Sequence, residues 1–261
     1  MSLISNKDLA LEVPAGSFSD KAAVNKFGRS NNVDQEDTDI WDRANETNDQ
    51  AIWVAPTAAR VHNIVSTSAV DDGTDITTAG ANAVQVYGLD ASWDLQNENV
   101  IVAGTSSLPT TGSYIRIFRM VVTGASDGGT NTGTITATAV TDATVTAQIQ
   151  PGAGQTLMAI YTVPNAKTAY MTQYYCSMEK GTPANASCNV TLLVREAADV
   201  ATSLFVTKHT QGMLDAGNSH IGHPFNPYFK IPEKSDIKMS GFASANDLDI
   251  TAGFDLILED N

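Results

Sequence analysis

The sequence predicts an all-β protein with two β-sandwich domains, of the jelly-roll or immunoglobulin-like type, preceded by an extended N-terminal arm. Three observations lead to this expectation. From about residue 52 onward, apolar and polar residues alternate with a period of two, which is the pattern of half-buried strands. Gly, Asn, Asp and Pro interrupt these runs at short intervals, as turns between strands require. A chain of 261 residues can also bury two cores of roughly 100 residues each.

Residues 1–51 differ from the rest of the chain and are expected to form an arm with an acidic linker. Acidic residues crowd the window 34–49, but the glycine and glutamate positions of a calcium-binding loop are missing there. Apolar residues occur in the arm without a sustained period, so they could pack on the chain itself or on a neighbouring chain. We expect contacts between subunits from Leu3, Leu9, Leu11, Phe27 and Trp41.

Residues 52–152 are expected to form the first sandwich domain. Period-two segments occur at 57–70, 82–104, 114–124, 132–139 and 143–152. The glycine-rich stretch "GASDGGTNTG" at 124–133 could be a phosphate-binding loop, but such loops precede a helix and this one precedes strand-like residues. Asp127, Gly128 and Gly129 instead suit a hairpin turn between two strands.

Residues 153–261 are expected to form the second sandwich domain. Its last segment, 248–258, alternates cleanly between apolar and polar residues, as a half-buried strand does. Cys176 and Cys188 have the inward parity of two strands, and a hairpin centred on Thr182 would place them opposite one another. Two cysteines do not make a disulfide framework, so we expect free, buried thiols.

No residue is predicted to be catalytic, to bind a cofactor or to bind a metal ion. His209, His220 and His223 lie near one another, but no cysteine or acidic ligand stands at a matching spacing for zinc. Trp93 and the aromatic residues of "HPFNPYF" at 223–229 could instead form a platform for a sugar. This second possibility keeps a carbohydrate-binding module or adhesin open as an alternative function.

The charge of the chain limits its partners. The formal net charge is −14, with 15 basic and 29 acidic side chains. Nucleic acids and anionic membrane surfaces attract basic patches, so we expect neither as a partner. No apolar run approaches the length of a membrane-spanning helix, and the N-terminus does not have the pattern of a secretory signal.

Nearly the whole chain, in order, resembles virion structural proteins of tailed bacteriophages, especially marine and environmental ones. The resemblance is carried by residues 25–34 and 36–42 and by "VQVYGLDASWDLQNENV", "SYIRIFRMVVTGASDGGTNTGTIT", "GQTLMAIYTVPNAKTAYMTQYY" and "PEKSDIKMSG…ITAGFDLILEDN". It implies a non-enzymatic structural role in a virion assembled in the host cytoplasm, as a homo-oligomer with major capsid or tail proteins as partners. Our first expectation is an exterior capsid accessory, a decoration or cement protein. A tail, collar or fibre-base component is the alternative within this class.

Overall fold

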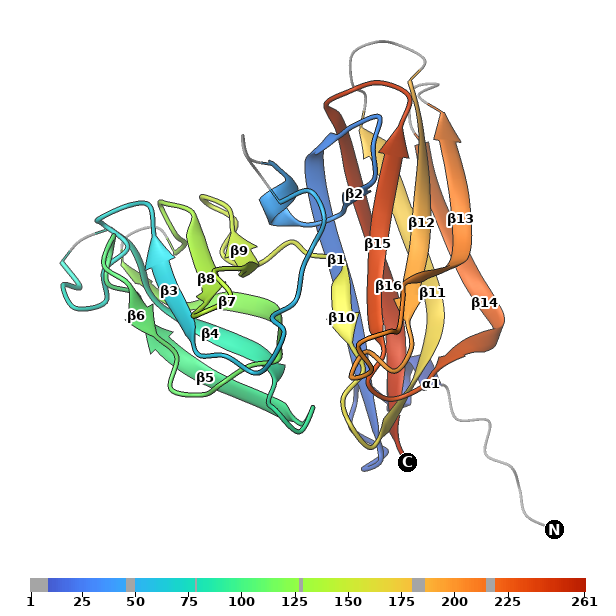
Figure 1. The fold of residues 1–261 in the computed structure, drawn as a ribbon, viewed down its shortest axis with the longest axis horizontal. Coiled ribbons are helices and arrows are strands. Elements are labelled where there is room, and N and C mark those ends of the chain that lie inside the picture. The colour runs from blue at the N-terminus through green and yellow to red at the C-terminus, as the bar shows by residue number, and fades with distance from the viewer. Residues whose placement is uncertain (1–8, 46–49, 78, 127–128, 180–185, 215–218) are drawn as a thin grey trace.

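The computed structural model describes residues 9–45, 50–77, 79–126, 129–179, 186–214 and 219–261, and the fold is all-β as predicted (Figure 1). Strands account for 58% of the chain and helix for 3%. The helical segments of the described residues are α1 (Leu9–Glu12) and the 3-10 turn η1 (Asp42–Asn45). No helix among these residues is long and apolar enough to cross a membrane.

Two of the four sheets are formed mainly by the C-terminal part of the chain. The first sheet has the order β1-β16-β11-β14, and the second has the order β10-β15-β12-β13, with β2 also paired to β15. Neighbouring strands are antiparallel throughout. The strands of the first sheet are β1 (Lys21–Val33), β16 (Leu248–Asp260), β11 (Lys167–Glu179) and β14 (Ser219–Ile231). Those of the second sheet are β10 (Ile160–Thr162), β15 (Asp236–Ala243), β12 (Ser187–Arg195), β13 (Val206–Leu214) and β2 (Thr38–Asp39).

The other two sheets come from the middle of the chain and lie beside the first pair in Figure 1. The third sheet has the order β6-β3-β8-β9, and the fourth has the order β5-β4-β7. The strands of the third sheet are β6 (Leu108–Pro109), β3 (His62–Ser66), β8 (Ile135–Ala139) and β9 (Val145–Ile149). Those of the fourth sheet are β5 (Leu95–Ile101), β4 (Gly80–Leu89) and β7 (Arg116–Ser126).

The four sheets contact one another in succession. Strand β14 of the first sheet contacts β13 of the second, β10 of the second contacts β7 of the fourth, and β7 contacts β9 of the third. The turn η1 contacts both β9 and β1 and so closes the circuit. The result is a propeller-like ring of four small sheets, and the predicted architecture of two β-sandwich domains is wrong. A period of two identifies strands, but it does not say which strands pair.

The predicted extended N-terminal arm is also wrong for most of its length. Strand β1 pairs with β16 from Lys21 opposite Glu259 to Val33 opposite Leu248, and β2 pairs with β15. The inward side of β1 carries buried Lys26, Gly28 and buried Ser30, so its sequence does not alternate between apolar and polar residues. Most of the segment expected to form an arm therefore belongs to the sheets, including Phe27 in β1.

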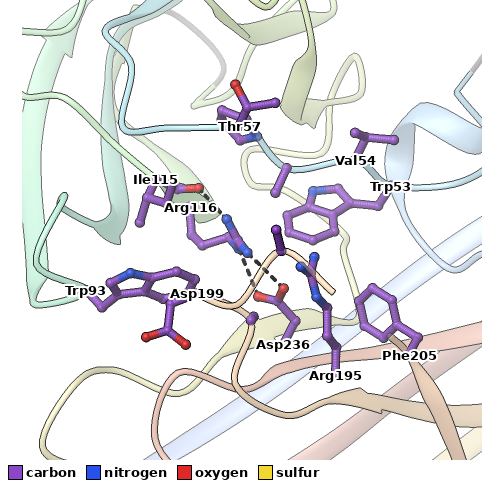
Figure 2. A pocket seen from close by; sticks show the side chains of 14 residues that line it. Trp53, Val54, Thr57, Trp93, Ile115, Arg116, Arg195, Asp199, Phe205 and Asp236 are labelled. Carbon is purple, nitrogen blue, oxygen red and sulfur yellow. Dashed lines mark hydrogen bonds and ion pairs between the residues drawn. The ribbon is translucent and has the colours of Figure 1, made fainter. Parts of the chain in front are cut away.

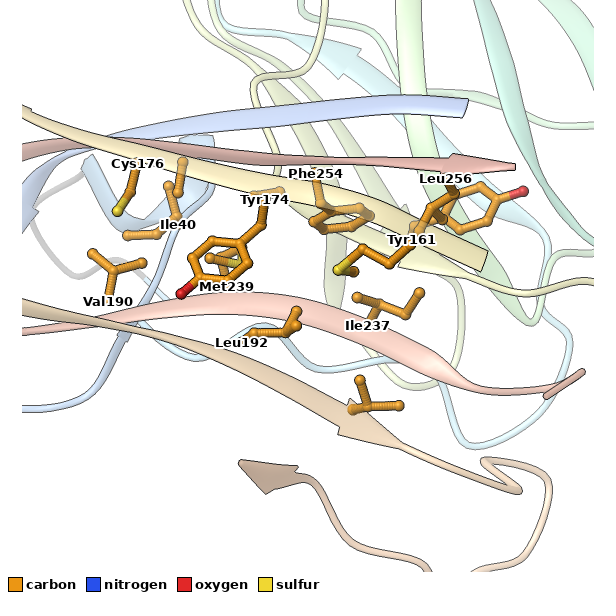
Figure 3. Close-up of a cluster of buried hydrophobic side chains, with 14 of the residues drawn as sticks. Ile40, Tyr161, Tyr174, Cys176, Val190, Leu192, Ile237, Met239, Phe254 and Leu256 are labelled. Atoms are coloured by element: carbon orange, nitrogen blue, oxygen red, sulfur yellow. The ribbon is translucent and has the colours of Figure 1, made fainter. Parts of the chain in front are cut away.

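Two hydrophobic clusters fill the molecule, and both draw on distant parts of the chain. The first lies between the first and second sheets, where Tyr174, Phe254 and Met239 meet (Figure 3). It also contains Leu89, Trp93, Ile115 and Phe118 from the middle of the chain. The second cluster packs the third and fourth sheets and includes Trp41, Met158 and Ile160. Core residues thus cross the predicted boundaries at 51/52 and 152/153.

The two thiols are free and buried, as predicted, but they do not belong to one hairpin. Cys176 in β11 lies opposite Ala252 and Ile221 in the first sheet, whereas Cys188 in β12 lies opposite Met213 and Ala243 in the second. The predicted pairing across one hairpin is therefore wrong, although the two thiols lie close enough for Cys176 to add to the rise that burial causes in the pKa of Cys188. Thr182, the expected hairpin centre, lies outside the described residues.

The glycine-rich stretch at 124–133 connects two sheets. It leaves β7 of the fourth sheet and leads into β8 of the third, so a strand and not a helix follows it, but the two strands are not a hairpin pair. Residues 127 and 128 lie outside the described part of the chain. The carboxylate of Asp71 accepts hydrogen bonds from the backbone N–H groups of Thr132 and Gly133, at 2.7 and 2.8 Å, and holds the end of this connection.

A substitution at Gly28 tests the packing of β1 against the second sheet. A Cβ atom at Gly28 would lie 2.4 Å from the backbone nitrogen of Ala159 and 2.5 Å from the carbonyl oxygen of Ile40, so backbone would have to move. We expect Gly28→Ala to lower the free energy of unfolding by about 1–3 kcal/mol, the usual cost of overpacking. Urea unfolding of both variants would measure this.

Gly222→Ala is the matched control, because Gly222 also lies in a strand and its Cβ would meet nothing within 4 Å. Alanine there should be neutral or slightly stabilising. Equal effects of the two substitutions would contradict the close approach of β1 to the second sheet.

Candidate functional site

A pocket of about 540 Å³ lies where the middle of the chain meets the second sheet (Figure 2). The segment before β3, the turn around Trp93, the start of β7, the β12–β13 connection and the start of β15 all contribute to it. The residues that line it are Trp53, Val54, Ala55, Pro56, Thr57, Trp93, Ile115, Arg116, Arg195, Ala198, Asp199, Ala201, Phe205 and Asp236.

A buried ion pair forms the floor of this pocket. Arg116 Nε and Nη2 donate to the two carboxylate oxygens of Asp236 at 2.8 and 2.9 Å, and Nη1 donates to the carbonyl oxygen of Ile115 at 2.8 Å. Thr162 Oγ1 donates to the same carboxylate at 2.7 Å. The side chains of Arg116 and Asp236 are 4% and 1% exposed, so both charges are removed from water and satisfied by each other.

Two tryptophan rings flank the guanidinium group of Arg116. Its Cζ lies 4.8 Å from the ring centroid of Trp93 and 5.9 Å from that of Trp53, within the range of a cation–π contact. Trp93 has a φ of 66°, a left-handed conformation that costs a bulky residue on the order of 1–3 kcal/mol. Its backbone is held there because its N–H donates to Asp90 and its carbonyl accepts from Asn165.

A second buried ion pair supports the wall beside Trp53. Lys238 Nζ lies 2.7 Å from Oδ2 of Asp39, and the backbone N–H of Trp53 donates to the same oxygen at 2.8 Å. Burial raises the pKa of the Asp39 carboxyl, and the Lys238 ammonium opposes that rise. Lys238 also lies 4.6 Å from the ring centroid of Phe205. Asp39 thus connects β2, β15 and the loop that carries Trp53.

The rim of the pocket carries one acidic and one basic side chain on opposite sides of Asp236 (Figure 2). Asp199 pairs with Lys234 at 3.3 Å. Arg195 donates through Nε to Ser203 at 2.8 Å and through Nη2 to the carbonyl oxygen of Val200 at 3.3 Å. Neither of these two partners of Arg195 carries a charge. Arg195 is therefore the cation of the pocket that no carboxylate of the described residues neutralises.

Two further buried basic groups lie away from the pocket. Lys26 Nζ donates to the carbonyl oxygen of Phe118 at 2.5 Å, and burial lowers the pKa of Lys26 to about 7. His62 contacts the carbonyl oxygen of Arg60 through Nδ1 at 2.9 Å, while its Nε2 is buried with no partner among the described residues. Burial lowers the pKa of His62 to about 4, so the neutral ring is the folded form.

The residues predicted to contact other subunits do not form one surface. Leu3 lies outside the described residues. Leu9 and Leu11 lie in α1, where Leu11 is 66% exposed, and Phe27 is half-buried in β1. Trp41 is fully buried in the chain's own core, and its Nε1 donates to the carbonyl oxygen of Gln50, so it does not offer a contact to a neighbour. For Leu9, Leu11 and Phe27 the predicted contact stays a prediction.

The positions of the three histidines and of the aromatic residues do not match the zinc site or the sugar-binding platform that the sequence left open. His209 and His223 stack with ring centroids 4.1 Å apart, and Tyr174 Oη lies 2.5 Å from Nδ1 of His209. His220 lies opposite Ser177 on β11. Among the described residues, no three His, Cys, Asp or Glu side chains form a group that could hold a metal ion. The segment 223–229 belongs to β14 and does not line the pocket that contains Trp93.

Sequence reasoning missed Arg116, Asp236 and Arg195. The signal for Arg116 was a charged residue inside the apolar run 114–122, where a buried charge must have a partner. No local pattern could identify that partner, because Asp236 is 120 residues away.

Comparison with known proteins gives only distant likenesses. No protein-family model and no curated protein sequence matches the chain. The chain is similar to two solved structures of infectious bursal disease virus. The alignment with the Gt strain has 7% sequence identity and covers 92% of this chain and 71% of the viral chain. The alignment with the VP2 subviral particle has 9% identity and covers 92% of this chain and 72% of the viral chain. Their TM-scores are 0.26 and 0.21. Scores this low carry no argument about the role of this chain.

The buried ion pair predicts a large cost for removing one partner. Asp236→Asn should lower the free energy of unfolding by about 3–5 kcal/mol, because Arg116 is left buried without a counter-charge. The double variant Arg116→Met, Asp236→Leu should recover much of this loss, since it removes both charges. Glu196→Gln breaks the exposed pair with Lys208 and should cost less than about 1 kcal/mol. Chemical unfolding that gave equal losses for the Asp236 and Glu196 variants would refute the buried pair.

The lowered pKa of His62 predicts that the stability of the fold depends on pH. Its folded pKa of about 4 is below the unfolded value of 6.5, so the unfolded chain binds a proton that the folded chain does not. This contribution to stability is present above pH 6.5 and is lost as the pH falls towards 4, by on the order of 3 kcal/mol. His62→Gln should flatten the stability profile between pH 6.5 and 4, whereas His220→Gln at an exposed site should leave it unchanged. Parallel profiles for wild type and His62→Gln would rule the effect out.

Proposed function

We propose that the chain is a non-enzymatic structural component of a tailed-phage virion, placed as an accessory subunit on the outside of the capsid. The observation that supports the proposal most directly is that the buried charged and histidine side chains form hydrogen bonds within the chain. Each of those among the described residues is hydrogen-bonded to the chain itself: Lys26, Asp39, Asp42, His62, Asp71, Arg116, Asp236 and Lys238. These hydrogen bonds join sheets and loops of the chain.

The resemblance to phage virion proteins supports this proposal from the sequence. It extends over nearly the whole chain and implies a structural role with no catalytic residues. The net charge of −14 favours the outer surface of a particle over its DNA-filled interior, because packaged DNA would repel an acidic subunit. A tail, collar or fibre-base position is the alternative within the same proposal.

Exposed apolar side chains on the edge strand β5 and on the short helix α1 are consistent with contacts to other subunits. Leu95 and Ile101 of the edge strand β5 are 53% and 49% exposed, and Leu11 of α1 is 66% exposed. An edge strand with apolar side chains offers both unpaired backbone groups and a dry contact surface to a neighbour. A free subunit exposes these groups, and assembly would cover them.

The contact proposed for α1 can be tested with single substitutions. Leu11→Asp should leave the fold intact, because surface substitutions usually change stability by about 0.5 kcal/mol or less. It should lower the occupancy of the subunit in particles, because a charge would be buried at the contact. Ile76→Asp is the matched control, since Ile76 is 71% exposed in the loop between β3 and β4. Occupancy is measured by quantitative mass spectrometry of purified particles.

Cryo-electron microscopy of the parent particle tests the location itself. Density for this chain on the outer capsid surface supports the first form of the proposal, and density in the tail or collar supports the alternative. If the chain is not found in purified particles, the proposal is wrong. If Leu11→Asp is incorporated as fully as Ile76→Asp, α1 does not contact a neighbour.

A further inference from the structure

We propose that the pocket that has Arg116 and Asp236 at its floor binds an acidic sugar. The carboxylate of the sugar would contact Arg195, and one face of the sugar ring would pack against the aromatic wall. This inference concerns a binding activity and does not depend on where in a virion the chain is placed. The volume of about 540 Å³ is within the range of pockets that hold small ligands, roughly 300–1,000 Å³.

The floor of the pocket cannot itself attract a charged ligand. All three nitrogens of the Arg116 guanidinium donate to the carboxylate of Asp236 or to the carbonyl of Ile115. The two charges therefore cancel, and the pair presents a fixed, neutral surface. Its function in the pocket is to hold the loops that carry the walls.

Arg195 is the group that selects for an anion. Its Nε and Nη2 donate to uncharged oxygens, and Nη1 donates to no described residue. Figure 2 shows its guanidinium group turned into the pocket below Trp53. An arginine whose guanidinium has donors left free is suited to bind a carboxylate.

The walls select for a ligand with an apolar face. Phe205, which is partly exposed, and Val54, which is 48% exposed, present apolar surface to the pocket. Trp53, Trp93 and Ile115 line it with 5%, 8% and 9% of their surface exposed. A bare phosphate or sulfate would leave this surface without a partner, whereas the C–H face of a sugar ring can pack against it. The left-handed backbone of Trp93 is a conformational cost of the kind that gathers at binding sites.

Asp199 is the residue that would favour binding of a sugar over binding of a simple aliphatic acid. It lies on the side of Asp236 away from Arg195 and next to Trp93 (Figure 2). Its carboxylate can accept hydrogen bonds from hydroxyl groups, which a fatty acid does not have along its chain. A hexuronate supplies all three features: a carboxylate, an apolar ring face and hydroxyl donors.

The test uses the full chain and three probes: methyl β-D-glucuronide, methyl β-D-glucoside and octanoate. Ligand-observed NMR titration should give saturable binding of the glucuronide at least about tenfold tighter than that of either other probe, because only it fits both Arg195 and the hydroxyl-accepting wall. Absence of saturable glucuronide binding would overturn the proposal. Octanoate binding as tight as the glucuronide would also overturn it, because the pocket would then recognise only a carboxylate beside an apolar wall.

Variants assign the binding to this pocket. Arg195→Gln should reduce glucuronide affinity to the level of the glucoside, and Phe205→Ala should weaken both sugars. Arg119→Gln and Phe242→Ala are matched controls: both residues are exposed and neither lines the pocket, so affinity should stay unchanged. Near-ultraviolet circular dichroism checks that each variant is folded. If folded Arg195→Gln keeps the preference for glucuronide over glucoside, the assignment of Arg195 is wrong.

Discussion

The buried pair of Arg116 and Asp236 is the interaction on which the arrangement of the sheets depends. Arg116 begins β7 of the fourth sheet and Asp236 begins β15 of the second, so the pair joins the middle of the chain to its C-terminal part. Trp53 and Trp93 cover the guanidinium, and Thr162 of β10 adds a hydrogen bond to the carboxylate. Geometry this complete offsets the desolvation of two charges and favours one relative position of the sheets.

The same junction positions several of the segments that line the pocket. The walls come from five segments of the chain, and the segment that carries Trp53 is held by the buried contacts of Asp39 with Lys238 and with the backbone of Trp53. A preformed pocket suits binding, since little ordering is needed when a ligand enters.

Much of the strand content could be predicted from the sequence, and little of the connectivity. Strand β16 alternates cleanly and was expected, because its apolar side chains face one core. The sequence of β1 does not mark it as a strand, because Lys26 and Ser30 occupy inward positions where apolar residues would indicate one. The sequence points to Trp93 but not to Arg116 and Asp236, since a pair that spans 120 residues leaves no local pattern. Period two identifies a strand and one face, whereas pairing depends on tertiary contacts.

The central claim is that the buried junction makes the four sheets one cooperative unit, and scanning calorimetry tests it most directly. If the sheets unfold together, the described structure predicts a single transition whose calorimetric and van't Hoff enthalpies agree. Two separate transitions, one for the third and fourth sheets and one for the first and second, would contradict the claim. In that case the ion pair would be only a local contact between independently stable parts.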